Sequence, residues 1–74
     1  MVNISIYFVD GSMSEYEEND LFILQLRKLQ NNGFQGKSLI NTLISDDWGA
    51  PPSSVILKGK LNDGSEINES IRYE

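Results

Sequence analysis

Apolar and polar residues alternate along both ends of the chain. In the first segment, Val2, Ile4, Ile6 and Phe8 alternate with polar residues, which is the period of a half-buried strand. A weaker alternation follows, and two more segments near the C-terminal end repeat it. The pattern predicts four strands, over Val2–Val9, Ser12–Glu17, Ser54–Leu61 and Glu66–Tyr73.

An Asp-Gly-Ser sequence joins the strands of each pair, and this composition is typical of a tight hairpin turn. In the first hairpin, a three-residue loop would place Val9 opposite Met13 and Ile6 opposite Tyr16. A two-residue loop would instead place Ile6 opposite Glu15. We prefer the first register because it keeps Tyr16 on the apolar side.

In the second hairpin, the same loop length places apolar residues opposite one another. Because a sheet with one buried face specifies its register strongly, we expect this pairing. It joins Leu61 to Ile67, Leu57 to Ile71 and Val55 to Tyr73.

The middle of the chain has a helical spacing of apolar residues, over Leu21–Gln30. Phe22, Leu26 and Leu29 form one stripe of this predicted helix, with Leu21 and Ile23 on its flanks. Leu24 falls on the other side, with Arg27 and Lys28. We expect Asn19 to cap the start of the helix, and Asn32 or Gly33 to end it.

A second, short helix is predicted over Leu39–Ile44, capped by Ser38. The resulting order is ββααββ, an α+β fold of two antiparallel hairpins packed on a central helix. The pattern leaves open whether the hairpins join into one four-stranded sheet. With 74 residues, the chain is expected to form a single small domain over residues 1–74.

Composition removes several classes of function. The chain has no cysteine and no histidine, so it lacks thiolate ligands and the commonest general base and metal ligand. We therefore expect no enzyme activity, no cofactor and no metal site. No apolar run reaches the ~20 residues that cross a bilayer, and no signal peptide is evident at the start. A cytoplasmic protein without membrane contact is the expectation.

One stretch, Gly33–Ser38, resembles a phosphate-binding loop at first sight. That motif requires Gly-x-x-x-x-Gly-Lys-Ser/Thr after a strand, but Asn31 holds the position of the first glycine and a helix precedes it. A turn between two helices explains the stretch better.

The net charge of −5 favours a protein partner with a basic surface and disfavours nucleic acid. Acidic side chains cluster before the first helix and after the second, where solvated loop and cap charges are the simpler explanation. The alternative is that they bind the partner, together with Leu24 and Trp48. The candidate partner-binding residues are Glu15, Glu17, Glu18, Asp20, Leu24, Asp46, Asp47 and Trp48.

The main functional hypothesis is therefore a small acidic, non-enzymatic protein-binding protein. One specific form of it is an inhibitor of the kind that phages and mobile elements use to block a host protein. Trp48 is interpreted first as a lid on the small core, and second as a partner contact.

Two alternatives use other residues. Lys58, Lys60 and Arg72 are predicted to share one face of the second hairpin, where they could contact a nucleic acid. Ordinary strand solubility explains them more simply. The other alternative is a structural homo-oligomer, such as a homodimer, formed through Leu24 or through a sheet edge.

Overall fold

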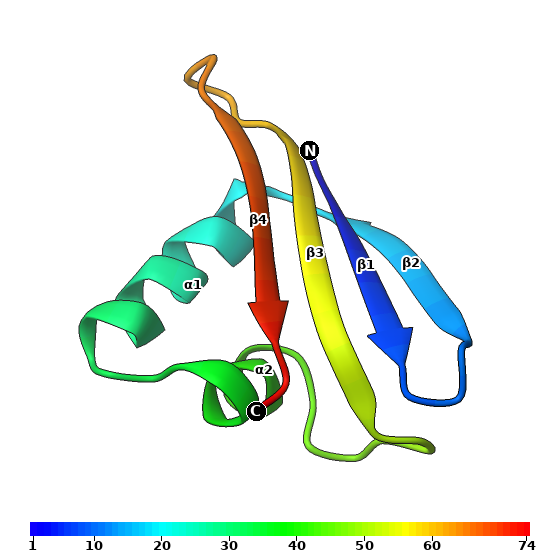
Figure 1. The fold of residues 1–74 in the computed structure, drawn as a ribbon. Coiled ribbons are helices and arrows are strands. Elements are labelled where there is room, and N and C mark those ends of the chain that lie inside the picture. Colours follow the sequence, from blue (N-terminus) through cyan, green and yellow to red (C-terminus); the bar gives the residue numbers. More distant parts are fainter.

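The computed structural model describes residues 1–74 and shows four strands in one antiparallel sheet, in the order β2-β1-β3-β4. The hairpins therefore join through their first strands, β1 and β3 (Figure 1). The strands are β1 (Val2–Phe8), β2 (Met13–Glu18), β3 (Pro52–Lys60) and β4 (Glu66–Arg72), and the helices are α1 (Asp20–Asn31) and α2 (Gly36–Leu43).

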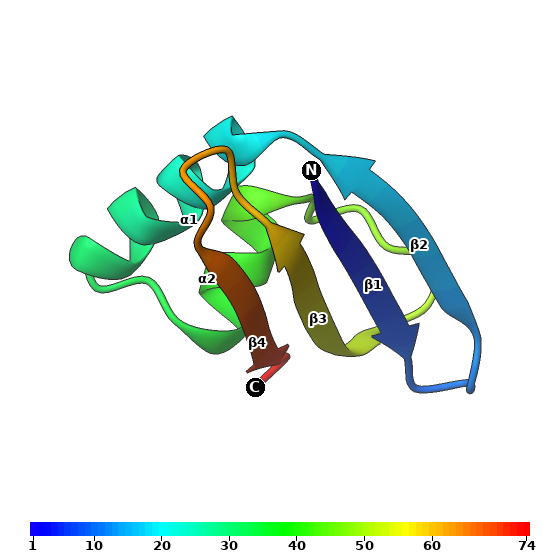
Figure 2. The same cartoon turned by 90° about the horizontal axis from the view of Figure 1, so that it is seen from above.

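Both helices lie on the same side of the sheet, and its other side is bare (Figures 1 and 2). The predicted ββααββ order and α+β class are confirmed. Neither helix has the length and apolar character needed to cross a membrane.

The first hairpin has the expected loop length, but the predicted register was wrong. The loop is Val9–Gly11, since the Phe8 N–H donates to the Ser12 carbonyl at 3.0 Å. Tyr7 consequently lies opposite Met13 and Ile4 opposite Tyr16. A three-residue loop ends in a left-handed residue, and Gly11, with φ of 89°, is that residue.

The second hairpin repeats this arrangement. Its loop ends at Gly64, with φ of 90°, and Leu61 N–H donates to the Ser65 carbonyl at 2.8 Å. The predicted pairing was therefore wrong by two residues. The pairs are Val55 with Ile71, Leu57 with Glu69 and Gly59 with Ile67. A shift of two leaves each side chain on its predicted face, so the core is unaffected.

Helix α1 begins and ends as the sequence predicts. The Asn19 side chain accepts the Leu21 N–H at 2.9 Å, which satisfies one of the free amides of the first turn. At the other end, Gly33 has φ of 91°. Its N–H donates to the Gln30 carbonyl and the Phe34 N–H to the Leu29 carbonyl, both at 3.0 Å. These two bonds form a Schellman motif.

The predicted cap of the second helix was wrong. Helix α2 starts at Gly36, after Gln35, which makes no side-chain capping bond. Ser38 lies inside the first turn, and its hydroxyl donates back to the Gln35 carbonyl at 2.9 Å. The Lys37 N–H instead donates to the backbone carbonyl of Glu74 at 3.0 Å. The end of the chain thus supplies the acceptor that Ser38 was expected to provide.

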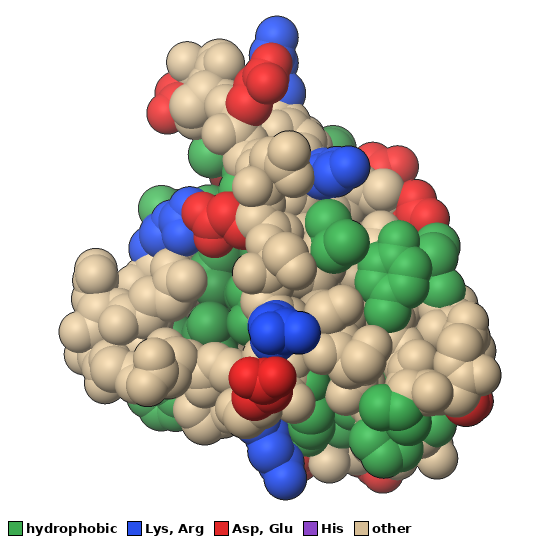
Figure 3. Space-filling view, viewed as in Figure 1, with side chains coloured by type: hydrophobic (Ala, Val, Ile, Leu, Met, Phe, Trp, Pro, Cys, Tyr) green, Lys and Arg blue, Asp and Glu red, His purple; other side chains and the backbone are tan.

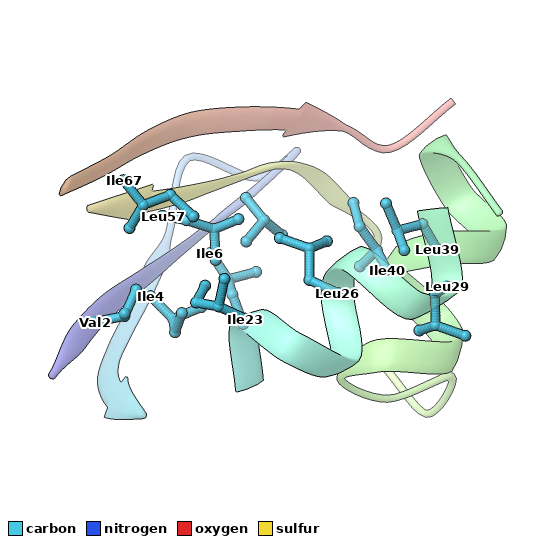
Figure 4. Packing of buried hydrophobic residues seen from close by; sticks show 11 residues of the cluster. Val2, Ile4, Ile6, Ile23, Leu26, Leu29, Leu39, Ile40, Leu57 and Ile67 are labelled. Carbon is cyan, nitrogen blue, oxygen red and sulfur yellow. The ribbon is translucent and has the colours of Figure 1, made fainter. Parts of the chain in front are cut away.

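The core lies between the sheet and the helices (Figure 4). Leu26 is fully buried, and Ile23 replaces Phe22 in the central stripe of α1, because Phe22 is only half-buried. Eleven buried apolar residues form a single cluster: Val2, Ile4, Ile6, Ile23, Leu26, Leu29, Leu39, Ile40, Val55, Leu57 and Ile67.

Candidate partner-binding surface

The bare side of the sheet is a continuous four-stranded surface that no helix covers (Figure 1). Because side chains alternate along a strand, the residues that do not join the core project from it. We call this surface the bare sheet face. It comprises Asn3, Ser5, Tyr7, Met13, Glu15, Glu17, Ser54, Ile56, Lys58, Lys60, Glu66, Asn68, Ser70 and Arg72.

A small apolar group lies on the bare sheet face, toward the end next to the β1–β2 turn. Tyr7 lies directly opposite Met13 on β2, and their exposed fractions are 37% and 48%. Ile56, half-buried on β3, lies opposite Ser5 on the adjacent strand. Figure 3 shows apolar side chains over β3, β1 and β2, with charged side chains around them.

Two of the predicted acidic residues share the bare sheet face with this apolar group: Glu15, next to Met13 on that face of β2, and Glu17, one position further. Glu15 lies opposite Ser5, and Glu17 opposite Asn3, so both project from the edge strand β2 onto the bare sheet face. The Asn3 side-chain amide donates to Glu15 Oε1 at 2.7 Å, which holds that carboxylate over the face. Neither glutamate takes part in an ion pair, so their charge is uncompensated.

The other predicted acidic residues lie elsewhere. Glu18 is opposite the buried Val2 and therefore points to the helical side. Asp20 begins α1, and its Oδ2 accepts the Asn62 N–H at 2.7 Å. Asp46 and Asp47 are exposed in the connection that follows α2, which runs on the helical side of the sheet (Figure 2). The acidic residues thus form no single surface.

Trp48 covers the end of the core. Its ring meets Phe8 edge to face, with ring centroids 5.9 Å apart, and its Nε1–H donates to Asn41 Oδ1 at 2.9 Å. The Tyr73 hydroxyl donates to the same oxygen, also at 2.9 Å. This half-buried indole serves as the lid that was the first interpretation.

Asn41 was not singled out from the sequence. Its place between Leu39, Ile40 and Leu43 indicates a half-buried helix position, but the sequence gives no sign that two distant aromatic residues share its oxygen.

The three basic residues of the alternative site are separated along the sheet. Lys58 lies opposite Asn68 and Lys60 opposite Glu66, whereas Arg72 lies opposite Ser54. Lys58 is four positions along β3 from Ser54, about 13 Å. Lys58 and Lys60 border a shallow hollow of about 410 Å³ with Gly59, Glu66, Ile67 and Asn68. Arg72 lies 3.9 Å from the Glu74 carboxylate.

Leu24 projects from α1 away from the core, as predicted, and 65% of it is exposed. Leu21, predicted on the flank of the core stripe, is equally exposed at 69%. Arg27 turns toward the sheet, where its guanidinium forms a two-pronged ion pair with Glu69 on β4. This hydrogen bonding raises the pKa of Arg27 above its usual value.

Glu69 was missed because it occupies a position on the helical side of an apolar strand. The only signal in the sequence was the position of Glu69 between Ile67 and Ile71, where the alternation along the strand predicts an apolar residue.

Comparisons with known proteins give no assignment: no family model matches the chain, and no curated protein or solved structure matches it significantly.

Proposed function

We propose that this chain is a non-enzymatic protein-binding domain that contacts its partner through the β2 side of the bare sheet face. The observation that carries the proposal is the pairing of an exposed apolar group with uncompensated charge. Tyr7 and Met13 lie side by side on the face, Glu15 is the next residue on that face of β2, and Glu17 follows one position further.

The two kinds of side chain would have different roles in binding. Tyr7 offers the apolar area and the hydroxyl that make tyrosine frequent among residues dominating binding energy. Glu15 and Glu17 would steer a basic surface toward the face and select it over an acidic one. The partner is therefore a protein with a basic surface that has an apolar centre.

The phage or mobile-element inhibitor is a narrower form of this proposal. In that form the basic partner is a host protein that loses its activity once its groove is covered by the acidic edge. Because the chain has no cysteine and so no disulfides, we propose the cytoplasm as its setting.

The test compares two charge-reversed variants that carry the same net charge. Glu15→Lys/Glu17→Lys changes the bare sheet face, whereas Asp46→Lys/Asp47→Lys changes the helical side. The immobilised proteins are incubated with a cell lysate at low and at high salt, and bound proteins are quantified by mass spectrometry. We expect a protein that the wild type captures at low salt, and less at high salt.

The same protein should be absent from Glu15→Lys/Glu17→Lys and retained by Asp46→Lys/Asp47→Lys. Capture that is unaffected by salt, or lost equally from both variants, would contradict the proposal.

Nucleic-acid binding is a competing proposal that rests on Lys58 and Lys60 around their shallow hollow. It requires retardation of an oligonucleotide at low salt that is lost in Lys58→Glu/Lys60→Glu. Absence of retardation by the wild type would remove it. Self-association, the remaining alternative, concerns the outer side of α1 and is independent of the bare sheet face.

A further inference from the structure

The outer side of helix α1 carries an apolar stripe that the fold leaves uncovered. Leu21, Leu24 and Lys28 follow one another at spacings of three and four residues, so they form one line along the helix. We call this line the outer stripe. Its two leucines are the most exposed large apolar residues of the chain, at 69% and 65%.

The outer stripe contributes nothing to the core. Ile23, Leu26 and Leu29 bury the opposite side of the helix, and Arg27 is held at the flank by Glu69. Two adjacent leucines in water cost hydrophobic free energy that a covering surface would recover. A single exposed leucine needs no explanation, whereas two in one line form a continuous apolar surface that another molecule could cover.

The charges at the two ends of α1 indicate which surface covers the stripe. Asp20 lies in the first turn of the helix, where its Oδ2 accepts the Asn62 N–H and its Oδ1 makes no hydrogen bond, and Lys28 lies in the last turn. An identical helix running antiparallel would bring Lys28 of each copy to Asp20 of the other. A parallel arrangement would set like charges against each other, and it would align the two helix dipoles unfavourably.

We propose that a second copy of this chain covers the outer stripe, with its own α1 antiparallel to the first. Leu24 of each copy then lies at the two-fold axis, and Leu21 packs on the apolar stem of the other copy's Lys28. The contact is isologous, because the same residues are used on both sides.

The expected dimer is weak. Two leucines and a lysine stem per copy fall well short of the roughly 800 Å² per partner of a standard interface. We therefore expect a concentration-dependent dimer, with a dissociation constant between about 1 µM and about 1 mM.

Sedimentation velocity from about 10 µM to about 1 mM tests this association directly. The wild type should shift from monomer to dimer across the range, and Leu24→Glu should stay monomeric. Val9→Glu is the matched control, because Val9 is also exposed, at 64%, but lies in the β1–β2 turn. It should dimerise like the wild type. Circular dichroism checks that each variant is folded.

A mixing experiment tests the antiparallel arrangement. Lys28→Glu alone and Asp20→Lys alone should each dimerise less than the wild type, because each places like charges together. When the two variants are mixed, both end contacts carry opposite charges again, and dimer should return. Lys58→Glu, on the bare sheet face, controls for net charge and should dimerise as the wild type does.

Three results would overturn the proposal. The first is a wild type that remains monomeric at about 1 mM, and the second is a dimer that persists in Leu24→Glu. The third is a mixture of Lys28→Glu and Asp20→Lys that stays monomeric, although both variants are folded and each dimerises less than the wild type. Because none of these variants except the Lys58→Glu control alters the bare sheet face, failure here would leave the proposed partner surface untouched.

Discussion

Asp10 and Asp63 occupy the same position in the two hairpin turns. Asp10 Oδ1 accepts the Ser12 N–H at 2.9 Å and the Ser12 hydroxyl at 2.5 Å. Asp63 Oδ1 accepts the corresponding groups of Ser65 at 2.9 and 2.6 Å. These hydrogen bonds favour the ionised carboxylate, so the pKa of each aspartate lies below its ordinary value of 3.8.

We expect both turns to loosen in acid. A carboxyl group whose pKa is lower in the folded state contributes stability above its unfolded pKa, and this contribution is lost as the pH falls through the folded pKa. An NMR titration of the Ser12 and Ser65 amide protons should give midpoints below 3.8. Ser12→Ala should raise only the Asp10 midpoint, with the Asp63 turn as internal control. Midpoints at or above 3.8 would contradict this account.

Among the elements, α2 is hydrogen-bonded to the connection that follows it and to the residues after β4. Through Asn41 it holds Trp48 of the following connection and Tyr73 beyond β4. At the first turn of the same helix, the Lys37 N–H donates to the Glu74 carbonyl. One side-chain oxygen therefore links α2 to the connection that follows it and to the distant Tyr73, at the end of the core that the sheet and α1 leave open.

Replacing Asn41 with Ala should release this lid. The half-buried indole N–H and the Tyr73 hydroxyl would lose their common acceptor, which should lower the free energy of unfolding by about 1–3 kcal/mol. Urea unfolding measures this loss, and Trp48 fluorescence should shift to longer wavelength in the folded variant. Asn68→Ala, on the bare sheet face, is the control and should leave both unchanged. Equal behaviour of the two variants would show that the shared oxygen does not hold the lid.

The existence and type of all six elements were predictable, because alternation and helical spacing are strong local signals. The registers were not, since they depend on which loop residue takes the left-handed conformation. Gly11 and Gly64 take it as the last loop residue, one position earlier than the predicted loops required. The prediction that Ser38 caps α2 was wrong for another reason. The first turn of α2 donates to the Glu74 carbonyl, and a contact with so distant a residue cannot be inferred from a local pattern.

The candidate surface was predictable in its parts but not as an assembly. The alternation of β2 places Glu15 and Glu17 on one face, and the structure retains them there. Their separation from Asp46 and Asp47 depends on the path of the α2–β3 connection (Figure 2). Hydrophobic spacing contains no information about that path.

At the scale of the whole molecule, the β1–β3 pairing is the joint between the two hairpins. Val2 of β1 lies opposite Gly59 of β3, and a Cβ on Gly59 would come within 2.5 Å of the Met1 carbonyl oxygen. Gly59 also has φ of 154°, which other residues rarely adopt. Because the buried residues of both hairpins belong to one cluster, loosening this joint should affect the entire core.

Gly59→Ala should therefore destabilise the whole domain rather than one hairpin. The unfavourable backbone conformation alone costs about 1–3 kcal/mol, and the clash with β1 adds to it. Guanidinium unfolding followed by far-UV circular dichroism and by Trp48 fluorescence should show one transition that shifts equally for both signals. Gly49→Ala is the control, because a Cβ there meets nothing within 4 Å. Two separate transitions would mean that the hairpins unfold independently, and equal stability of the two variants would mean that the joint tolerates a side chain. A single shifted transition is expected because the buried side chains of both hairpins pack in one core, so neither hairpin can lose its packing alone.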